Sequence, residues 1–252
     1  MSNAKEHSPW ASGPGEILRH GLELLKKDSD RNRRLAMISV DNAVELMMKT
    51  FLGLPKRINK LAITRKEIEE CSESFPRLLD ALETHASERI EGIELGEIEW
   101  YHRLRNQLYH QGNGLTVERE KVDVYAALGQ ILFKNLFGFD LVESAESSAI
   151  VTQTKAGLLG EFLVLWADLE KTLAQRATGK APEGDSPRMP MELARQLAQS
   201  GELTKEEHRE FELLRLIRND LAHGRTGHTE AEISAAAAKL QSILSKVKMR
   251  WQ

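Results

Sequence analysis

The sequence predicts an all-α protein made of two tandem helical bundles. Apolar residues recur at helical spacing nearly everywhere, as in the stripes Val40, Val44, Met47, Phe51 and Leu159, Phe162, Trp166, Leu169, Leu173. Alternation typical of strands between hairpin turns is scarce. Two T-x-x-E sequences, at Thr204 and Thr229, are typical of capping boxes, in which a hydroxyl and a carboxylate satisfy the free N–H groups at a helix start.

The expected elements follow from where this periodicity breaks. Gly, Pro, Ser and charged residues replace it at 52–57, 138–157 and 177–190. We expect four segments: a flexible N-terminal arm (1–14), a first helical domain (15–139), a linker (140–153) and a second helical domain (154–252). The helices expected in the first domain are 15–27, 32–52, 66–84, 95–111 and 116–137. Those expected in the second are 154–176, 190–200, 204–223 and 229–249.

Composition excludes several classes of function. The 35 Lys and Arg against 38 Asp and Glu give a formal net charge of -3, so no global field attracts nucleic acid or an anionic membrane. The single cysteine, Cys71, cannot form an internal disulfide, which is typical of a reducing cytoplasm. No apolar run reaches the roughly 18 residues of a membrane span. No phosphate-binding loop, dinucleotide fingerprint or metal-ligand spacing is present, so neither a cofactor nor a metal is expected.

One short sequence occurs twice. The chain reads RNQLYHQG at 105–112 and RNDLAHGR at 218–225, an offset of 113 residues. The windows 101–116 and 214–229 agree at six of sixteen positions, which indicates an internal duplication. Thr116 and Thr229 each follow the repeated histidine by six residues and are expected to be N-caps.

Each copy predicts a helix with an apolar and a polar face. The apolar faces are expected to be Tyr101, Leu104, Leu108 and Leu214, Ile217, Leu221. The polar pairs are Asn106, His110 and Asn219, His223, with Arg105 and Arg218 on the flank of the apolar stripe, from where a long side chain can bend toward the polar face. An isolated histidine here is more often a charge that favours a helix C-terminus. Its repetition with Arg and Asn at fixed offsets favours a function.

Arginine and histidine on one polar face suit phosphate chemistry. Arginine is a permanent forked cation for phosphate oxygens, and histidine exchanges a proton near pH 7. With RNA, a histidine can deprotonate the 2′-hydroxyl or protonate the leaving 5′-oxygen, while arginines stabilise the charged phosphorus centre. Such a cleavage needs no metal but is best served by two proton-transfer groups, which two copies brought face to face supply.

The two R-N-x-x-x-H sequences resemble the signature of the HEPN superfamily, an arginine followed after four to six residues by a histidine near the end of a bundle helix. The resemblance implies two HEPN-like bundles packed as a pseudo-dimer, with a composite ribonuclease site between them. It implies RNA as a partner and, as in many members, a toxin or defence effector held by an antitoxin or regulatory protein. The residues that carry it are Arg105, His110, Arg218 and His223 as catalytic groups, with Asn106 and Asn219 supporting them.

Several alternatives stay open. Other family members have lost catalysis, so a non-catalytic helical module that binds RNA, a nucleotide or a protein is the second hypothesis, and a homo-oligomer is compatible with either. Segment 56–94 has no counterpart in the second half. The charged residues His102, Arg103, Arg215 and Arg225 could hold RNA phosphates or be ordinary exposed charges. Glu45 and Glu170 are expected to be solvated or paired within their helices, and the charged run 26–34 to be a solvated helix junction.

Overall fold

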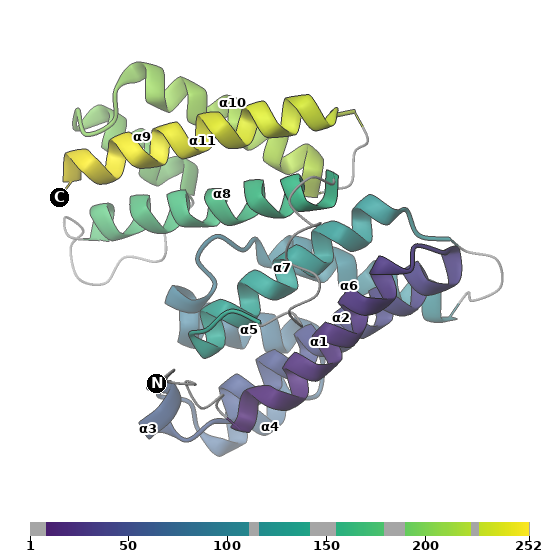
Figure 1. Ribbon diagram of the computed structural model, residues 1–252. Coiled ribbons are helices and arrows are strands. Elements are labelled where there is room, and N and C mark those ends of the chain that lie inside the picture. Colours follow the sequence, from purple (N-terminus) through teal and green to yellow (C-terminus); the bar gives the residue numbers. More distant parts are fainter. Residues whose placement is uncertain (1–8, 111–115, 142–154, 179–189, 223–226, 252) are drawn as a thin grey trace, which may run out of the picture. The chain divides into compact units, whose positions relative to one another are not determined.

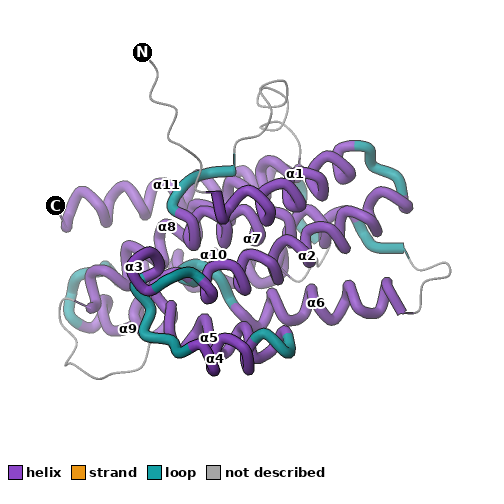
Figure 2. Tube along the Cα trace, turned by 90° about the horizontal axis from the view of Figure 1, so that it is seen from below, coloured by secondary structure: helices purple, strands orange, loops and turns teal. Residues whose placement is uncertain are grey.

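The computed structural model describes residues 9–110, 116–141, 155–178, 190–222 and 227–251, and every regular element in these ranges is helical (Figure 2). This confirms the all-α class. The chain divides into two compact units, Met1–Ala145 and Glu146–Gln252. The predicted linker 140–153 lies almost wholly outside the described residues. The two units are described separately below.

Unit 1 is built around one long helix. Its α2 contacts α1, α5, α6 and α7 and so occupies the centre of the unit (Figure 1). The helices of unit 1 are η1 (Pro9–Ala11), α1 (Ser12–Lys26), α2 (Asp30–Gly53), α3 (Lys56–Asn59), α4 (Arg65–Cys71), α5 (Phe75–Ala86), η2 (Ser87–Arg89), α6 (Leu95–His110) and α7 (Arg119–Phe137). Four of the five predicted helices correspond to α1, α2, α6 and α7. The first begins earlier than expected, at Ser12, inside the segment expected to be an arm.

Small residues let α1, α2 and α7 approach closely. A Cβ added to Gly21 of α1 would lie 3.0 Å from Val40 Cγ2 and 3.3 Å from the Val40 backbone nitrogen. Gly129 of α7 faces Val40 and Val44 at ordinary van der Waals distance. Val40 and Val44 are fully buried. The close contact with α1 therefore fixes the position of α2 at the residue that precedes Asp41.

A buried asparagine holds the C-terminal end of α2. Asn59, 4% exposed, donates from Nδ2 to the carbonyl oxygens of Phe51 (3.0 Å) and Leu54 (2.9 Å). Its Oδ1 accepts from the Leu61 backbone N–H at 3.0 Å. These bonds satisfy carbonyl groups that a helix end leaves without intrahelical partners. They also fold segment 56–61 back onto α2.

The predicted helix 66–84 is wrong as a single element. It is two helices, α4 and α5, separated at 72–74. A capping box of Thr64 and Glu67 starts α4, and Ser74 precedes α5, which has Pro76 in its first turn. Proline is tolerated in a first turn but interrupts a helix interior, so it makes a new start here rather than continuing α4.

The charged run 26–34 is a solvated helix junction, as predicted. Ser29 caps α2 by accepting from the Asn32 N–H at 3.2 Å. Asp28, with a positive φ of 37°, binds Arg119 Nη1 at 2.9 Å, and Arg119 Nε lies 3.3 Å from Asp123. This ion-pair chain ties the turn between α1 and α2 to the start of α7.

Thr116 is not an N-cap, contrary to the prediction. The helix that follows it, α7, begins at Arg119 and has Glu118 in the N-cap position. Thr229 does cap its helix: its hydroxyl accepts from the Glu232 N–H at 3.3 Å, and the Glu232 carboxylate accepts from the Thr229 N–H at 2.7 Å. The helices that follow the two copies of the repeated sequence therefore have different N-cap residues.

Unit 2 is a four-helix arrangement in its described residues. Its helices are α8 (Lys155–Thr178), α9 (Pro190–Gln199), α10 (Lys205–Ala222) and α11 (Glu230–Trp251), close to the predicted ranges. The long helix α8 packs on α9, α10 and α11. Trp166 stacks on Phe211 with ring centroids 4.9 Å apart, so an aromatic pair joins α8 to α10.

Both capping boxes predicted for unit 2 are present. Thr204 and Glu207 bond reciprocally at 2.8 and 3.1 Å to start α10. Glu207 also accepts a bidentate pair of bonds from Arg250 of α11, at 2.8 and 2.9 Å. One carboxylate thus caps α10 and binds it to the end of α11.

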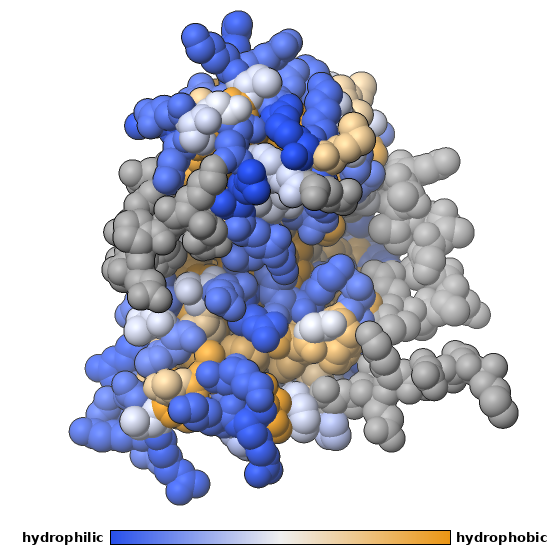
Figure 3. All heavy atoms as spheres, turned by 90° about the vertical axis from the view of Figure 1, so that its left-hand side faces the viewer, coloured by the Kyte–Doolittle hydropathy of each residue, from blue (hydrophilic) through white to orange (hydrophobic). Residues whose placement is uncertain are grey.

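Hydrophilic side chains cover most of the molecular face in Figure 3, with apolar side chains between them. Large apolar side chains that are exposed in unit 2 include Leu213, Leu216 and Met249. None of the described helices combines the length and the apolar character needed to cross a membrane.

Candidate functional site

A buried carboxylate, Asp41, lies at the centre of unit 1. It belongs to α2 and is 0% exposed, because it occupies the core-facing stripe that also contains Met37, Val44 and Met48. An ionised carboxylate is strongly destabilised in such a place unless cations and hydrogen-bond donors surround it. The groups that surround Asp41 therefore indicate its role.

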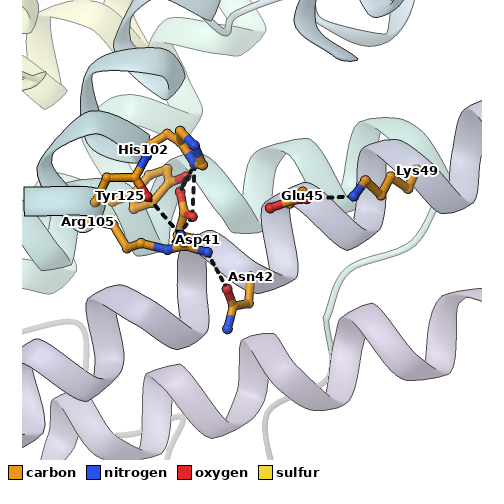
Figure 4. Close-up of polar contacts among 8 residues, drawn as sticks. Asp41, Asn42, Glu45, Lys49, His102, Arg105 and Tyr125 are labelled. Carbon is orange, nitrogen blue, oxygen red and sulfur yellow. Dashed lines mark hydrogen bonds and ion pairs between the residues drawn. The ribbon is translucent and has the colours of Figure 1, made fainter. Parts of the chain in front are cut away.

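Three side chains from α6 and α7 converge on Asp41 (Figure 4). Tyr125 Oη donates to Oδ1 at 2.7 Å. His102 Nδ1 lies 3.0 Å from Oδ2 and 3.2 Å from Oδ1. Arg105 Nε lies 2.9 Å from Oδ2, as an ion pair whose N–H direction does not suit a hydrogen bond. We call these four residues the Asp41 cluster.

The guanidinium of Arg105 is held in place by further bonds. Nη1 donates to Asn106 Oδ1 at 2.8 Å, and Nη2 donates to Asn42 Oδ1 at 2.6 Å. Each Nη carries two N–H groups, so one on each is left without an acceptor among the described residues. The side chain is 18% exposed. Arg105 is therefore an oriented cation at the edge of the unit, with donors to spare, which is the arrangement that phosphate oxygens require.

His102 is fixed in two ways. Its ring stacks on Phe75 of α5, with centroids 3.7 Å apart and planes 7° from parallel. Its Nδ1 faces the Asp41 carboxylate, which accepts only, so Nδ1 carries a proton. Nε2 is then the nitrogen left for solvent or a ligand, and the side chain is 14% exposed.

Tyr125 serves as a permanent donor. It is fully buried and stacks on Tyr101, with centroids 4.7 Å apart and planes at 10°. Burial, and then the neighbouring charge of Asp41, raise the pKa of the Tyr125 hydroxyl well above its ordinary value. The hydroxyl consequently stays protonated and keeps donating to Asp41 throughout the physiological pH range.

The structure brings some of the predicted residues of unit 1 together and separates others. His102, Arg105 and Asn106 lie at or beside Asp41. Arg103 instead faces solvent, 66% exposed, and pairs with Glu99 at 3.0 Å, as an ordinary helix charge does. His110 is the last residue of α6, and its side chain lies outside the described residues.

The repeated sequence has a different environment in unit 2. Arg218 on α10 is only 2% exposed, whereas Arg105 reaches the surface. Asn219 and Arg215 are half-buried, and His223 and Arg225 lie outside the described residues. The two arginines of the repeat are therefore not equivalent in their access to a ligand.

The glutamates of the long helices also differ. Glu45 pairs with Lys49 one turn away at 2.6 Å, which confirms the expectation of a helix-paired residue (Figure 4). Glu170 was expected to be solvated or helix-paired, and the solvated alternative is wrong: it is 7% exposed. Apolar residues flank it on α8, including Leu169 and Leu173, so helical periodicity turns it inward.

Sequence reasoning missed Asp41, Asn42 and Tyr125. One signal was available for Asp41, since it is the only charged residue in the stretch AMISVDNAV, at a position where helical spacing demands an apolar side chain. Nothing local marks Tyr125, which looks like any core aromatic residue. Its role comes from a contact with a residue 84 positions earlier.

Comparison with known proteins finds no relative. No family model matches the chain. No curated protein and no solved structure matches it either. Within the described ranges, no group of three or more His, Cys, Asp or Glu residues is arranged to hold a metal ion. What the chain does must therefore be argued from its own residues.

Proposed function

We propose that the chain is a HEPN-like endoribonuclease that needs no metal, with both repeated motifs contributing to its active site. The observation that carries the proposal is Arg105, an oriented and partly exposed guanidinium with free N–H groups, inside an R-N-x-x-x-H sequence that occurs twice. A role as a toxin or defence effector, restrained by an antitoxin or regulatory protein, belongs to the same proposal.

In this mechanism Arg105 binds the phosphate whose ester bond is broken. Its remaining N–H groups neutralise charge as the phosphorus becomes five-coordinate. His110 and His223 are the proton-transfer groups, one accepting the proton of the 2′-hydroxyl and the other protonating the 5′-oxygen that leaves. The products are a 2′,3′-cyclic phosphate and a 5′-hydroxyl.

The burial of Arg218 shapes the proposal. A side chain that is 2% exposed does not meet RNA without rearrangement, so we assign phosphate binding to Arg105 and a structural role to Arg218. The two motifs then contribute different groups, and the site lacks two-fold symmetry. Asn106 supports Arg105 directly, through its 2.8 Å bond with Nη1.

The second candidate is a non-catalytic module that binds RNA, a nucleotide or a protein partner. The net charge of -3 and the burial of Arg218 favour it, because RNA-binding surfaces usually carry more accessible basic charge. On this alternative the Asp41 cluster holds Arg105 as a recognition residue only.

Cleavage assays separate the two candidates. The purified protein is incubated with structured and unstructured RNAs in EDTA, and the ends of any product are identified by mass spectrometry. We expect cyclic phosphate ends, lost in His110→Ala, His223→Ala and Arg105→Ala and retained in His20→Ala and Arg31→Ala, which alter exposed residues of the same unit. Binding without cleavage of any RNA in the panel supports the second candidate and refutes the first.

A further inference from the structure

The repeated motif accounts for only part of the chemistry at the Asp41 cluster. His102 precedes Arg105 by three residues and is no part of the R-N-x-x-x-H sequence. Yet it has the most constrained histidine environment in the described part of unit 1, with its ring against Phe75 and its Nδ1 against Asp41. A histidine that served only to fill space would not require a buried carboxylate.

We propose that His102 is a general base of the ribonuclease site, with Asp41 and Phe75 as its positioning residues. The inference rests on the proposed function and changes it in one respect, since His102 takes the base role that was given there to one of the two motif histidines. A carboxylate at Nδ1 holds the imidazole in the tautomer whose Nε2 is the basic nitrogen. The same carboxylate stabilises the positive charge that the ring acquires when Nε2 takes a proton, as in other Asp–His pairs.

Helix geometry places His102 beside the other reactive groups. His102, Asn106 and His110 follow one another at intervals of four residues on α6, so they lie along one face within about 80° of arc. Arg105 lies between them in sequence and donates to Asn106. Arg105 Nε and His102 Nδ1 lie 2.9 and 3.0 Å from the same oxygen, Asp41 Oδ2, so a phosphate bound by the Arg105 N–H groups lies beside the His102 ring.

The proposed step is a balanced transfer. His102 Nε2 removes the proton of the 2′-hydroxyl, the 2′-oxygen bonds to phosphorus, and the bond from phosphorus to the 5′-oxygen breaks. The 5′-oxygen leaves with a proton supplied by one of the two motif histidines of the proposed function, His110 or His223. No oxidant, reductant or further reactant is needed, and a later exchange with water restores both histidines.

The second unit has a different residue at the position of His102. The residue that corresponds to His102 under the 113-residue offset is Arg215, which cannot act as a base near neutral pH. The inference therefore assigns the base to unit 1 alone. It also agrees with the difference in burial between Arg105 and Arg218.

Two substitutions at His102 separate a catalytic from a structural role. Asparagine places its side-chain NH₂ close to the position of Nδ1, so His102→Asn keeps a donor for Asp41 but removes Nε2. Glutamine places its amide near Nε2 and gives up the donor, so His102→Gln weakens the cluster instead. His20→Asn, at an exposed position on α1, is the matched control.

We expect His102→Asn to melt within a few degrees of the wild type and to lower kcat about 100-fold or more, with KM little changed. Wild-type kcat in a well-folded His102→Asn variant overturns the inference while leaving the proposed function intact. An inactive wild type instead refutes the proposed function itself.

A second measurement does not depend on activity. In the protein labelled with ¹⁵N-histidine, one neutral imidazole should show the Nδ1–H tautomer, and its signal should disappear in His102→Asn. A His102 signal with the proton on Nε2 overturns the inference whatever the cleavage assays show, because the ring then has no basic nitrogen facing away from Asp41.

Discussion

Asp123 gives unit 1 a pH dependence opposite to that of a carboxylate whose pKa is lowered by an ion pair, such as Glu207. Its side chain is 10% exposed, and burial raises its pKa from 3.8 to about 6, although Arg119 at 3.3 Å opposes the change. Between these two pH values the folded protein binds a proton that the unfolded chain has lost. The contribution of Asp123 to stability is therefore complete below about pH 4 and is lost as the pH rises through 6.

Replacing Asp123 by asparagine, which does not titrate, removes this loss of stability at rising pH. The gap between 3.8 and about 6 corresponds to about 3 kcal/mol, since each pH unit is worth about 1.4 kcal/mol. We expect the stability difference, Asp123→Asn minus wild type, to rise by about that amount between pH 4 and pH 7. A weaker bond between the asparagine and Arg119 lowers the difference equally at every pH and leaves this rise unchanged.

Urea unfolding at pH 4, 5, 6 and 7 tests this expectation. Hydrogen-exchange mass spectrometry on peptides from α7 reports on unit 1 separately from unit 2. Asp80→Asn, at an exposed position on α5, is the control and should show no such trend. A difference that stays flat, or falls as the pH rises, refutes the reasoning that burial outweighs the attraction of Arg119.

Three further predictions concern single side chains. Asp41→Ala leaves Arg105 and two further donors without their acceptor and should lower the free energy of unfolding of unit 1 by about 3 kcal/mol, measured in urea. Arg250 lowers the pKa of Glu207 to about 2, so the stability gained from Glu207 is present above pH 4.5 and lost as the pH falls toward 2. In Glu207→Gln the melting temperature of unit 2 should therefore fall less between pH 4.5 and pH 2 than it does in the wild type. Gly21→Val should destabilise unit 1 by about 1 to 3 kcal/mol, because its side chain meets the backbone of α2, whereas Gly96→Ala, with open space around it, should be neutral or stabilising in the same urea assay.

Much of the fold could be predicted because helix signals are local. Apolar spacing located the long helices, and the T-x-x-E sequences at Thr204 and Thr229 located two helix starts. Thr116 misled because an N-cap needs a helix that begins at the next residue, and α7 begins three residues later. The break at 72–74 was missed because a helical apolar pattern continues across it.

The site was predictable only in part. Arg105 and Asn106 could be singled out as candidates because their motif lies within one helix. Asp41 and Tyr125 were missed because their importance arises from contacts between helices. The burial of Arg218 could not be read from its helix face either, since the flank of an apolar stripe can point toward solvent or under a neighbouring helix.

The contacts of Asp41 also bear on the order of folding. Its bonds to His102 and Tyr125 join residues 61 and 84 positions apart, across two different helices. Contacts that close such long loops form late, after local helices have appeared. We therefore expect the carboxylate to stay hydrated until α6 and α7 have both docked on α2. Its replacement should accelerate unfolding more than it slows folding. The Asp41 bonds thus stabilise only the state in which α2, α6 and α7 are all packed in their native positions.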